Sequence, residues 1–132
     1  MSLLVQADEL ATLLRSPTPP VVFDATALLP GEGGNPAERF LHEHIAGSLY
    51  FDIDIFSDLQ GLFPHTVPSA ARYASLMGAL GVARTDPVVF YDQGNIASAC
   101  RAWWLATLFG HDTVRILDGG LPAWLRVCLL YT

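Results

Sequence analysis

Apolar and polar positions along the chain predict four buried strands that alternate with helices. Short apolar runs bounded by proline, glycine or charged residues predict strands at residues 21–25, 48–51, 88–91 and 114–117. Apolar residues at helical spacing predict helices over residues 8–14, 36–43, 70–80, 98–109 and 121–126. This alternation is typical of an α/β domain whose mostly parallel sheet is covered by helices on both faces.

Residues with strong local preferences refine these boundaries. Ser69 is placed to cap the start of a helix, and Gly81 and Gly110 follow the last periodic positions of two helices. Residues 53–58 have room for one helical turn, and residues 60–68 contain two prolines and a glycine, which predicts a long exposed loop.

The turn that joins the strand at 88–91 to the next helix is the first candidate site. It consists of Asp92, Gln93, Gly94, Asn95, Ile96 and Ala97. A turn from a buried parallel strand into a helix directs free backbone N–H groups toward one point, and ligands of open α/β sheets bind at such turns.

Composition excludes several classes of function. The 132 residues suffice for one domain with a real core, and the net charge of −6, with no basic cluster, argues against nucleic acid and anionic membranes as partners. No apolar run reaches the length of a membrane span, and the first residues lack the basic region of a signal peptide. Two cysteines make no disulfide framework, so we expect a reduced, cytoplasmic setting. Neither a metal nor a cofactor is predicted.

Three stretches resemble the rhodanese family. Arg39 to Ser48 resembles the signature R-x-x-x-x-H-I-P-G-A, with Ala46 for the usual proline and Ser48 for the usual alanine. The segment from Asp118 to Trp124 resembles the second signature, D-G-G-L-x-x-W. Residues 50–54 and 62–68 are similar to the first half of the tandem thiosulfate and 3-mercaptopyruvate sulfurtransferases.

The resemblance implies a rhodanese fold, with a mostly parallel five-stranded sheet and helices on both faces. It also implies transfer of sulfane sulfur from thiosulfate or 3-mercaptopyruvate to a thiophile, through a persulfide on a cysteine at the first loop position. In this chain that position is Asp92. A carboxylate cannot carry sulfane sulfur, and its charge would occupy the N–H groups and repel anions. We therefore expect Asp92 to cap the helix, the alternative being a catalytic carboxylate, and the chain alone to be inactive.

The same resemblance gives Asp54 and His65 a supporting role. In the tandem enzymes the matching aspartate and histidine are proposed to reach the active site of the second domain and to assist proton transfer there. A carboxylate that orients an imidazole is sound general acid–base chemistry. The alternative is a loop histidine and a helix-capping aspartate.

Other candidates have structural alternatives that we favour. Cys100 could be a displaced nucleophile, but a thiol one turn inside a helix is more often a small core residue. Asp52 with Asp54, and His42 with His44, could suggest metal ligands, but neither pair has the remaining ligands nearby, and one histidine is expected to bond the helix end. Arg39 is expected to pair with an acidic group under the loops, the alternative being that it binds substrate. Trp103 and Trp104 cannot share one helix face, so one should be core and the other an interface residue.

These observations predict a single rhodanese-like domain over residues 1–126, followed by a non-matching apolar tail over 127–132. Its function would be that of the non-catalytic half of a truncated tandem sulfurtransferase. The expected partner is a second rhodanese domain, missing here, or a second copy that binds through the exposed interdomain face. The alternative is a stand-alone protein-binding module.

Overall fold

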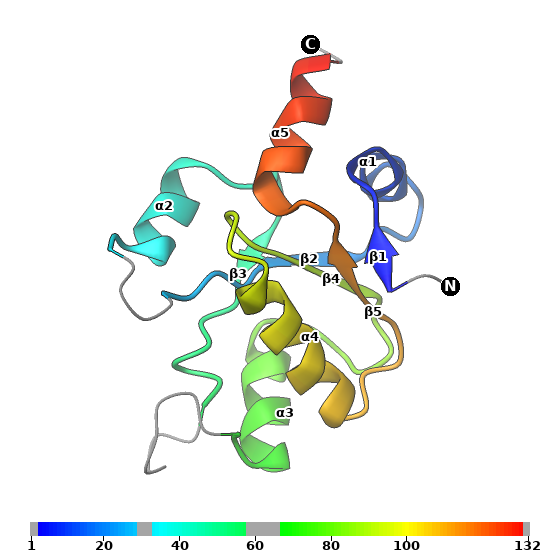
Figure 1. Cartoon of the computed structure of the whole chain (residues 1–132). Coiled ribbons are helices and arrows are strands. Elements are labelled where there is room, and N and C mark those ends of the chain that lie inside the picture. The colour runs from blue at the N-terminus through cyan, green and yellow to red at the C-terminus, as the bar shows by residue number, and fades with distance from the viewer. Residues whose placement is uncertain (1–2, 29–32, 58–66, 131–132) are drawn as a thin grey trace.

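The computed structural model describes residues 3–28, 33–57 and 67–130, except for the side chains of 128–130 (Figure 1). Most of the loop expected at 60–68 lies outside these residues. The described strands form one five-stranded sheet in the order β1-β5-β4-β2-β3, and every neighbouring pair is parallel. The strands are β1 (Leu4–Val5), β2 (Val21–Asp24), β3 (Leu49–Tyr50), β4 (Val88–Tyr91) and β5 (Val114–Leu117). The α/β fold class is confirmed.

The edge strand β1 is the one strand that the hydrophobic pattern did not locate. Its two residues are too few to show an alternation, and they form a strand because β5 lies beside them, with Leu4 opposite Ile116 and Val5 opposite Leu117. The sheet partner, rather than the local sequence, determines this element.

The helices cover both faces of the sheet, with α3 and α4 on one side and α1 and α5 on the other (Figure 1). Their bounds are α1 (Ala7–Leu14), α2 (Pro36–His42), α3 (Ala70–Ala79), α4 (Ala97–Leu108) and α5 (Gly120–Leu130). Helix α5 is longer than the expected 121–126, because no glycine or proline follows Arg126 to end it. Val127 packs on the core, so the expected tail begins as a continuation of this helix.

Strand β4 divides the core into two clusters because its side chains alternate between the faces. Val88 and Phe90 pack with α3 and α4, while Val89 and Tyr91 pack with α1 and α5. All four side chains are buried, which explains the continuous apolar run in the sequence. The Tyr91 hydroxyl accepts a hydrogen bond from the Ile45 backbone N–H (3.2 Å) and lies 3.0 Å from the Ser48 hydroxyl.

Local signals at the helix ends are confirmed. The Ser69 side chain accepts a hydrogen bond from the Arg72 N–H at the start of α3, and Gly81 follows that helix with a φ of 79°. Gly110 follows α4 with a φ of 81°. The helical turn expected after residue 53 is present, since the Phe56 N–H donates to the Asp52 carbonyl (3.0 Å).

Candidate functional site

Loop 92–97 lies at the carboxyl end of the sheet, where β4 passes into α4. β2 runs beside β4, with Asp24 opposite Tyr91, so the residues after each strand meet at this edge. The Ala25 N–H donates to the Tyr91 carbonyl (2.9 Å) and extends the pairing one residue further. The turn after β4 therefore faces the turn after β2, which is where a parallel sheet places its ligand site.

Asp92 fills the start of α4 with its own carboxylate. The side chain is 4% exposed, and it accepts hydrogen bonds from the backbone N–H groups of Gly94 (3.0 Å) and Ala99. Ala99 belongs to the first turn of α4, whose N–H groups have no partner within the helix. Burial raises the pKa of the Asp92 carboxyl, and these two hydrogen bonds offset part of the rise. The carboxylate thus occupies the position where a bound anion would be stabilised.

Helix α5 closes the loop from the other side. The Leu121 N–H donates to the Asp92 carbonyl oxygen (2.8 Å). Gly120 has a φ of 59°, and a Cβ atom there would lie 2.6 Å from that oxygen and 2.9 Å from Asp92 Oδ1. Only glycine fits this close approach, which gives the Asp-Gly-Gly sequence before α5 a physical reason.

Below the loop, Gln93 joins three segments through one buried network. Its Nε2 donates to Asp24 Oδ2 (2.9 Å) and to the Pro36 carbonyl (3.0 Å), and its backbone N–H donates to Thr26 Oγ1 (2.8 Å). The other Asp24 oxygen accepts from the Thr26 N–H and hydroxyl. Sequence reasoning missed Asp24 and Thr26, although an aspartate that ends a buried strand was a signal for them.

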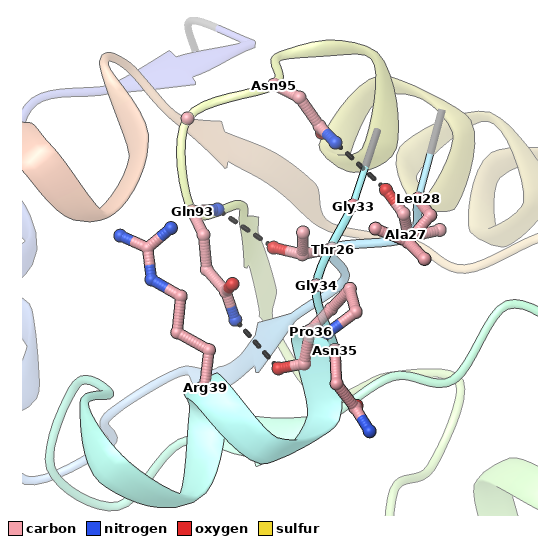
Figure 2. A pocket seen from close by; sticks show the side chains of 11 residues that line it. Thr26, Ala27, Leu28, Gly33, Gly34, Asn35, Pro36, Arg39, Gln93 and Asn95 are labelled. Carbon is pink, nitrogen blue, oxygen red and sulfur yellow. Dashed lines mark hydrogen bonds between the residues drawn. The ribbon is translucent and has the colours of Figure 1, made fainter. Parts of the chain in front are cut away.

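The far end of the loop is tied to the segment after β2. Asn95 Nδ2 donates to the Ala27 carbonyl (2.9 Å), an interaction visible in Figure 2. Ser98 Oγ accepts from the Ala27 N–H (3.0 Å) and lies 3.3 Å from its carbonyl oxygen. The loop is consequently held by side chains at both ends.

A cavity of about 240 Å³ opens beside this loop (Figure 2). Its walls come from the segments after β2, before and within α2, and after β4. They comprise Thr26, Ala27, Leu28, Gly33, Gly34, Asn35, Pro36, Arg39, Gln93, Gly94 and Asn95. Arg39 makes no ion pair or hydrogen bond with any described residue, so its expected pairing with an acidic group is not seen in this part of the chain. Among the described residues of these walls, its guanidinium is the one charged group.

Asp54 lies in the wall of a second cavity of about 410 Å³, which shares five lining residues with the first, namely Ala27, Leu28, Gly34, Asn35 and Pro36. Asp52 and Tyr50 also line it, and burial, followed by the nearby aspartates, raises the pKa of Tyr50 to about 12. Asp54 is exposed, and its N–H donates to Asp52 Oδ1 (3.0 Å). His65 lies outside the described residues.

The remaining candidates have structural roles or none that is visible. His44 Nδ1 lies 2.7 Å from the Phe40 carbonyl, so one histidine does bond the end of α2 as expected. Trp103 packs on the core and Trp104 is exposed, which confirms their separation. Cys100 is exposed, contrary to its expected core position, since α4 turns it toward solvent. In the described part of the chain no three His, Cys, Asp or Glu residues could hold a metal ion.

Fold and loop together define a parallel α/β domain with its site at a strand-to-helix turn. The family model described as a rhodanese-like domain matches residues 6–126, and the chain belongs to that family. The 3-mercaptopyruvate sulfurtransferase of Escherichia coli (strain K12) is 41% identical over 127 residues, which are 96% of this chain and 45% of that protein. The mitochondrial thiosulfate/3-mercaptopyruvate sulfurtransferase 1 of Arabidopsis thaliana is 40% identical over 121 residues, 92% of this chain and 32% of that protein.

Solved structures agree. The crystal structure of the 3-mercaptopyruvate sulfotransferase SseA from Escherichia coli matches with a TM-score of 0.88 and 37% identity, over 97% of this chain and 49% of that one. The chain therefore spans about half the length or less of these relatives, and it is homologous to one domain of 3-mercaptopyruvate sulfurtransferases. Among the described residues, no helix is long and apolar enough to cross a membrane.

Proposed function

We propose that this chain is the non-catalytic half of a sulfurtransferase that moves sulfane sulfur from thiosulfate or 3-mercaptopyruvate to a thiophile. The observation that carries the proposal is the Asp92 carboxylate, which accepts the Gly94 and Ala99 N–H groups at the start of α4. An active loop would hold a cysteine there and use such N–H groups to stabilise its thiolate and persulfide. An oxygen nucleophile cannot form the persulfide.

Cys100 does not replace the missing nucleophile. Its N–H donates to the Ile96 carbonyl (3.2 Å) within α4, and its side chain is exposed on the helix face away from the core. At that position the thiol lies apart from the N–H groups at the start of α4, which Asp92 already accepts. Helix geometry therefore supports an inactive chain rather than a relocated active site.

The assay that tests this proposal measures cyanide-dependent thiocyanate production from thiosulfate and from 3-mercaptopyruvate. We expect the chain to give no rate above the buffer blank, and Cys100→Ser to change nothing. Thiocyanate production that Cys100→Ser abolishes would overturn the proposal, because it would place a persulfide on Cys100.

Asp54 and His65 would support the partner domain's active site. Asp54 is exposed on a cavity wall, where a second domain could reach it, and the family resemblance pairs it with His65. A hybrid in which this chain replaces the matching half of the Escherichia coli enzyme tests the role. We expect the hybrid to transfer sulfur from mercaptopyruvate, and both Asp54→Asn and His65→Gln to lower kcat by about 10²-fold or more, in line with loss of proton transfer. Asp8→Asn, on α1, serves as the matched control.

The second candidate function is a stand-alone protein-binding module, and the exposed face of α4 favours it. Ile96, Cys100, Trp104 and Leu108 follow one another at four-residue spacing, and all are exposed. Exposed apolar stripes of this kind mark interaction surfaces. In the tandem protein this stripe would contact the second domain, and in the isolated chain it would contact a second copy.

Light scattering separates the monomer from the dimer. We expect the isolated chain to self-associate and Trp104→Glu to return it to a monomer, with Leu41→Glu, an exposed apolar residue on α2, as control. A wild-type chain that stays monomeric at high concentration would contradict association through this stripe. The expected cytoplasmic location remains a prediction, and the Arabidopsis relative is named as mitochondrial.

A further inference from the structure

Arg39 is a cation that faces the candidate site, and no anion among the described residues pairs with it. Glu38 and Glu43 lie close to it in the sequence, yet neither forms an ion pair with it. Its side chain rises from α2 alongside Gln93 toward the β4–α4 loop (Figure 2). A guanidinium in this setting offers a fork of N–H donors to a molecule that enters the cavity.

The other described residues that line the cavity are neutral and leave room at the backbone. A Cβ atom on Gly33, Gly34 or Gly94 would meet nothing within 4 Å, so the cavity is open above these glycines. Both hydrogens of Gln93 Nε2 are donated to Asp24 and Pro36, which fixes the amide, and Gln93 Oε1 accepts no hydrogen bond from the described residues. The walls thus combine one cation, open backbone and one available acceptor.

The two buried carboxylates of the region do not line the cavity. Asp24 accepts three hydrogen bonds from Thr26 and Gln93, and Asp92 accepts those from Gly94 and Ala99. Hydrogen bonds of this kind hold both carboxyl groups behind the walls, so Arg39 is the charged side chain among the described residues that line this cavity.

We propose that this cavity binds a small oxyanion, either a carboxylate or a sulfur oxyanion, through the Arg39 guanidinium. Two oxygens of one ligand can accept parallel hydrogen bonds from the guanidinium fork. The volume of about 240 Å³ falls below the range typical of drug-sized ligands, which limits the occupant to a small molecule. Gln93 Oε1 could accept a hydrogen bond from a hydroxyl, a thiol or a water carried with it.

This site is separate from the N–H groups that Asp92 fills, and it does not rest on the proposed function. Turnover of thiosulfate by this chain would overturn the proposed function, but it would leave the measured binding of an anion at Arg39 unaffected. The two proposals can therefore fail independently.

Titration of the ¹⁵N-labelled chain at fixed ionic strength tests the site. Three probes are used. Pyruvate represents organic carboxylates, thiosulfate represents sulfur oxyanions, and pyruvamide is an uncharged analogue of pyruvate. We expect saturable shifts of the Gly33, Gly34 and Gln93 amide signals with one or both anions and none with pyruvamide. The anion that binds more tightly shows whether the ligand of this cavity is a carboxylate or a sulfur oxyanion.

Arg39→Gln should weaken binding by about tenfold to hundredfold, as expected for loss of a charged hydrogen bond. Arg39→Lys should recover part of the affinity, because it retains the charge and loses the fork. Arg15→Gln removes the same charge at the end of α1, away from the cavity, and should leave the affinity unchanged. Shifts that never saturate, that persist in Arg39→Gln, or that weaken equally in Arg15→Gln would overturn the site.

Discussion

Gln93 Nε2 and Asp24 Oδ2 lie 2.9 Å apart, and this buried contact joins the turn after β4 to the end of β2. Asp24 is fully buried and Gln93 nearly so. A carboxylate in such a place requires donors, since an unpaired buried charge is strongly destabilising. The contact therefore stabilises the fold while it orients the loop.

Gln93→Ala should lower the free energy of unfolding by about 1–3 kcal/mol, because Asp24 Oδ2 and the Pro36 carbonyl lose their donor. Urea denaturation measures the change. Gln6→Ala is the matched control, since Gln6 Nε2 donates to Asp118 Oδ2 at 3.0 Å in an exposed position. Water can replace that bond, so its loss should cost no more than about 0.5 kcal/mol. Equal effects of the two variants would contradict a structural role for the buried contact.

Gly120→Ala should be more damaging than an ordinary glycine substitution. The new Cβ would lie 2.6 Å from the Asp92 carbonyl oxygen, in addition to the strain of a φ of 59°. We expect a loss of about 3 kcal/mol or more from steric overlap and strain together. Gly47→Ala has a similar φ of 80° with open space around it, and should cost about 1–2 kcal/mol. Denaturation curves that show the same loss for both would argue that α5 does not press on the loop.

Asp92→Asn should stabilise the chain increasingly as the pH rises. Burial raises the folded-state pKa of Asp92 above its ordinary value of 3.8. The protonated form is thus favoured in the folded state, and the stability it contributes is fully present below pH 3.8 and is lost as the pH rises through the folded pKa. The asparagine oxygen can still accept the Gly94 and Ala99 N–H groups. Thermal unfolding of both chains between pH 3 and 7 measures this effect. A difference in melting temperature that stays constant over this range would contradict the raised pKa.

Asp92→Cys should convert the occupied loop into one that holds sulfur. The Gly94 and Ala99 N–H groups would then face a thiolate, and the thiol pKa should fall below the free value of about 8.5. Attack on the sulfane sulfur of thiosulfate would form the new S–S bond and release sulfite with the electron pair of the broken bond. In a Cys100→Ser background, peptide mass spectrometry should find one added sulfur atom on residue 92. An ordinary thiol pKa with no adduct would show that the loop has lost its anion-binding shape.

The sequence was sufficient for elements whose signals are local. The run from Val88 to Tyr91 and the caps at Ser69 and Gly81 appear where their chemistry predicts them. Strand β1 and the close fit of Gly120 on Asp92 depend on segments more than twenty residues away, so no local pattern reveals them.

The candidate site likewise has one part that the sequence predicts and one part that it does not. The turn at residues 92–97 follows from the strand–helix alternation, and the substitution at Asp92 is visible in the sequence. The network of Asp24, Thr26 and Gln93 arises because two parallel strands end side by side, which only the sheet order establishes. The absence of a described ion partner for Arg39 likewise appears only when its neighbours are placed in space.

The hydroxyl pair of Ser48 and Tyr91 carries an evolutionary consequence. The buried phenol, whose pKa burial raises to about 12, gains a second hydrogen-bond partner beside the Ile45 N–H, because serine stands where the family signature has alanine. A buried hydroxyl group requires a hydrogen-bond partner, so the two positions should covary among related sequences. Lineages with phenylalanine at position 91 would be free to carry alanine at position 48, whereas those that keep tyrosine should tend to keep serine or threonine.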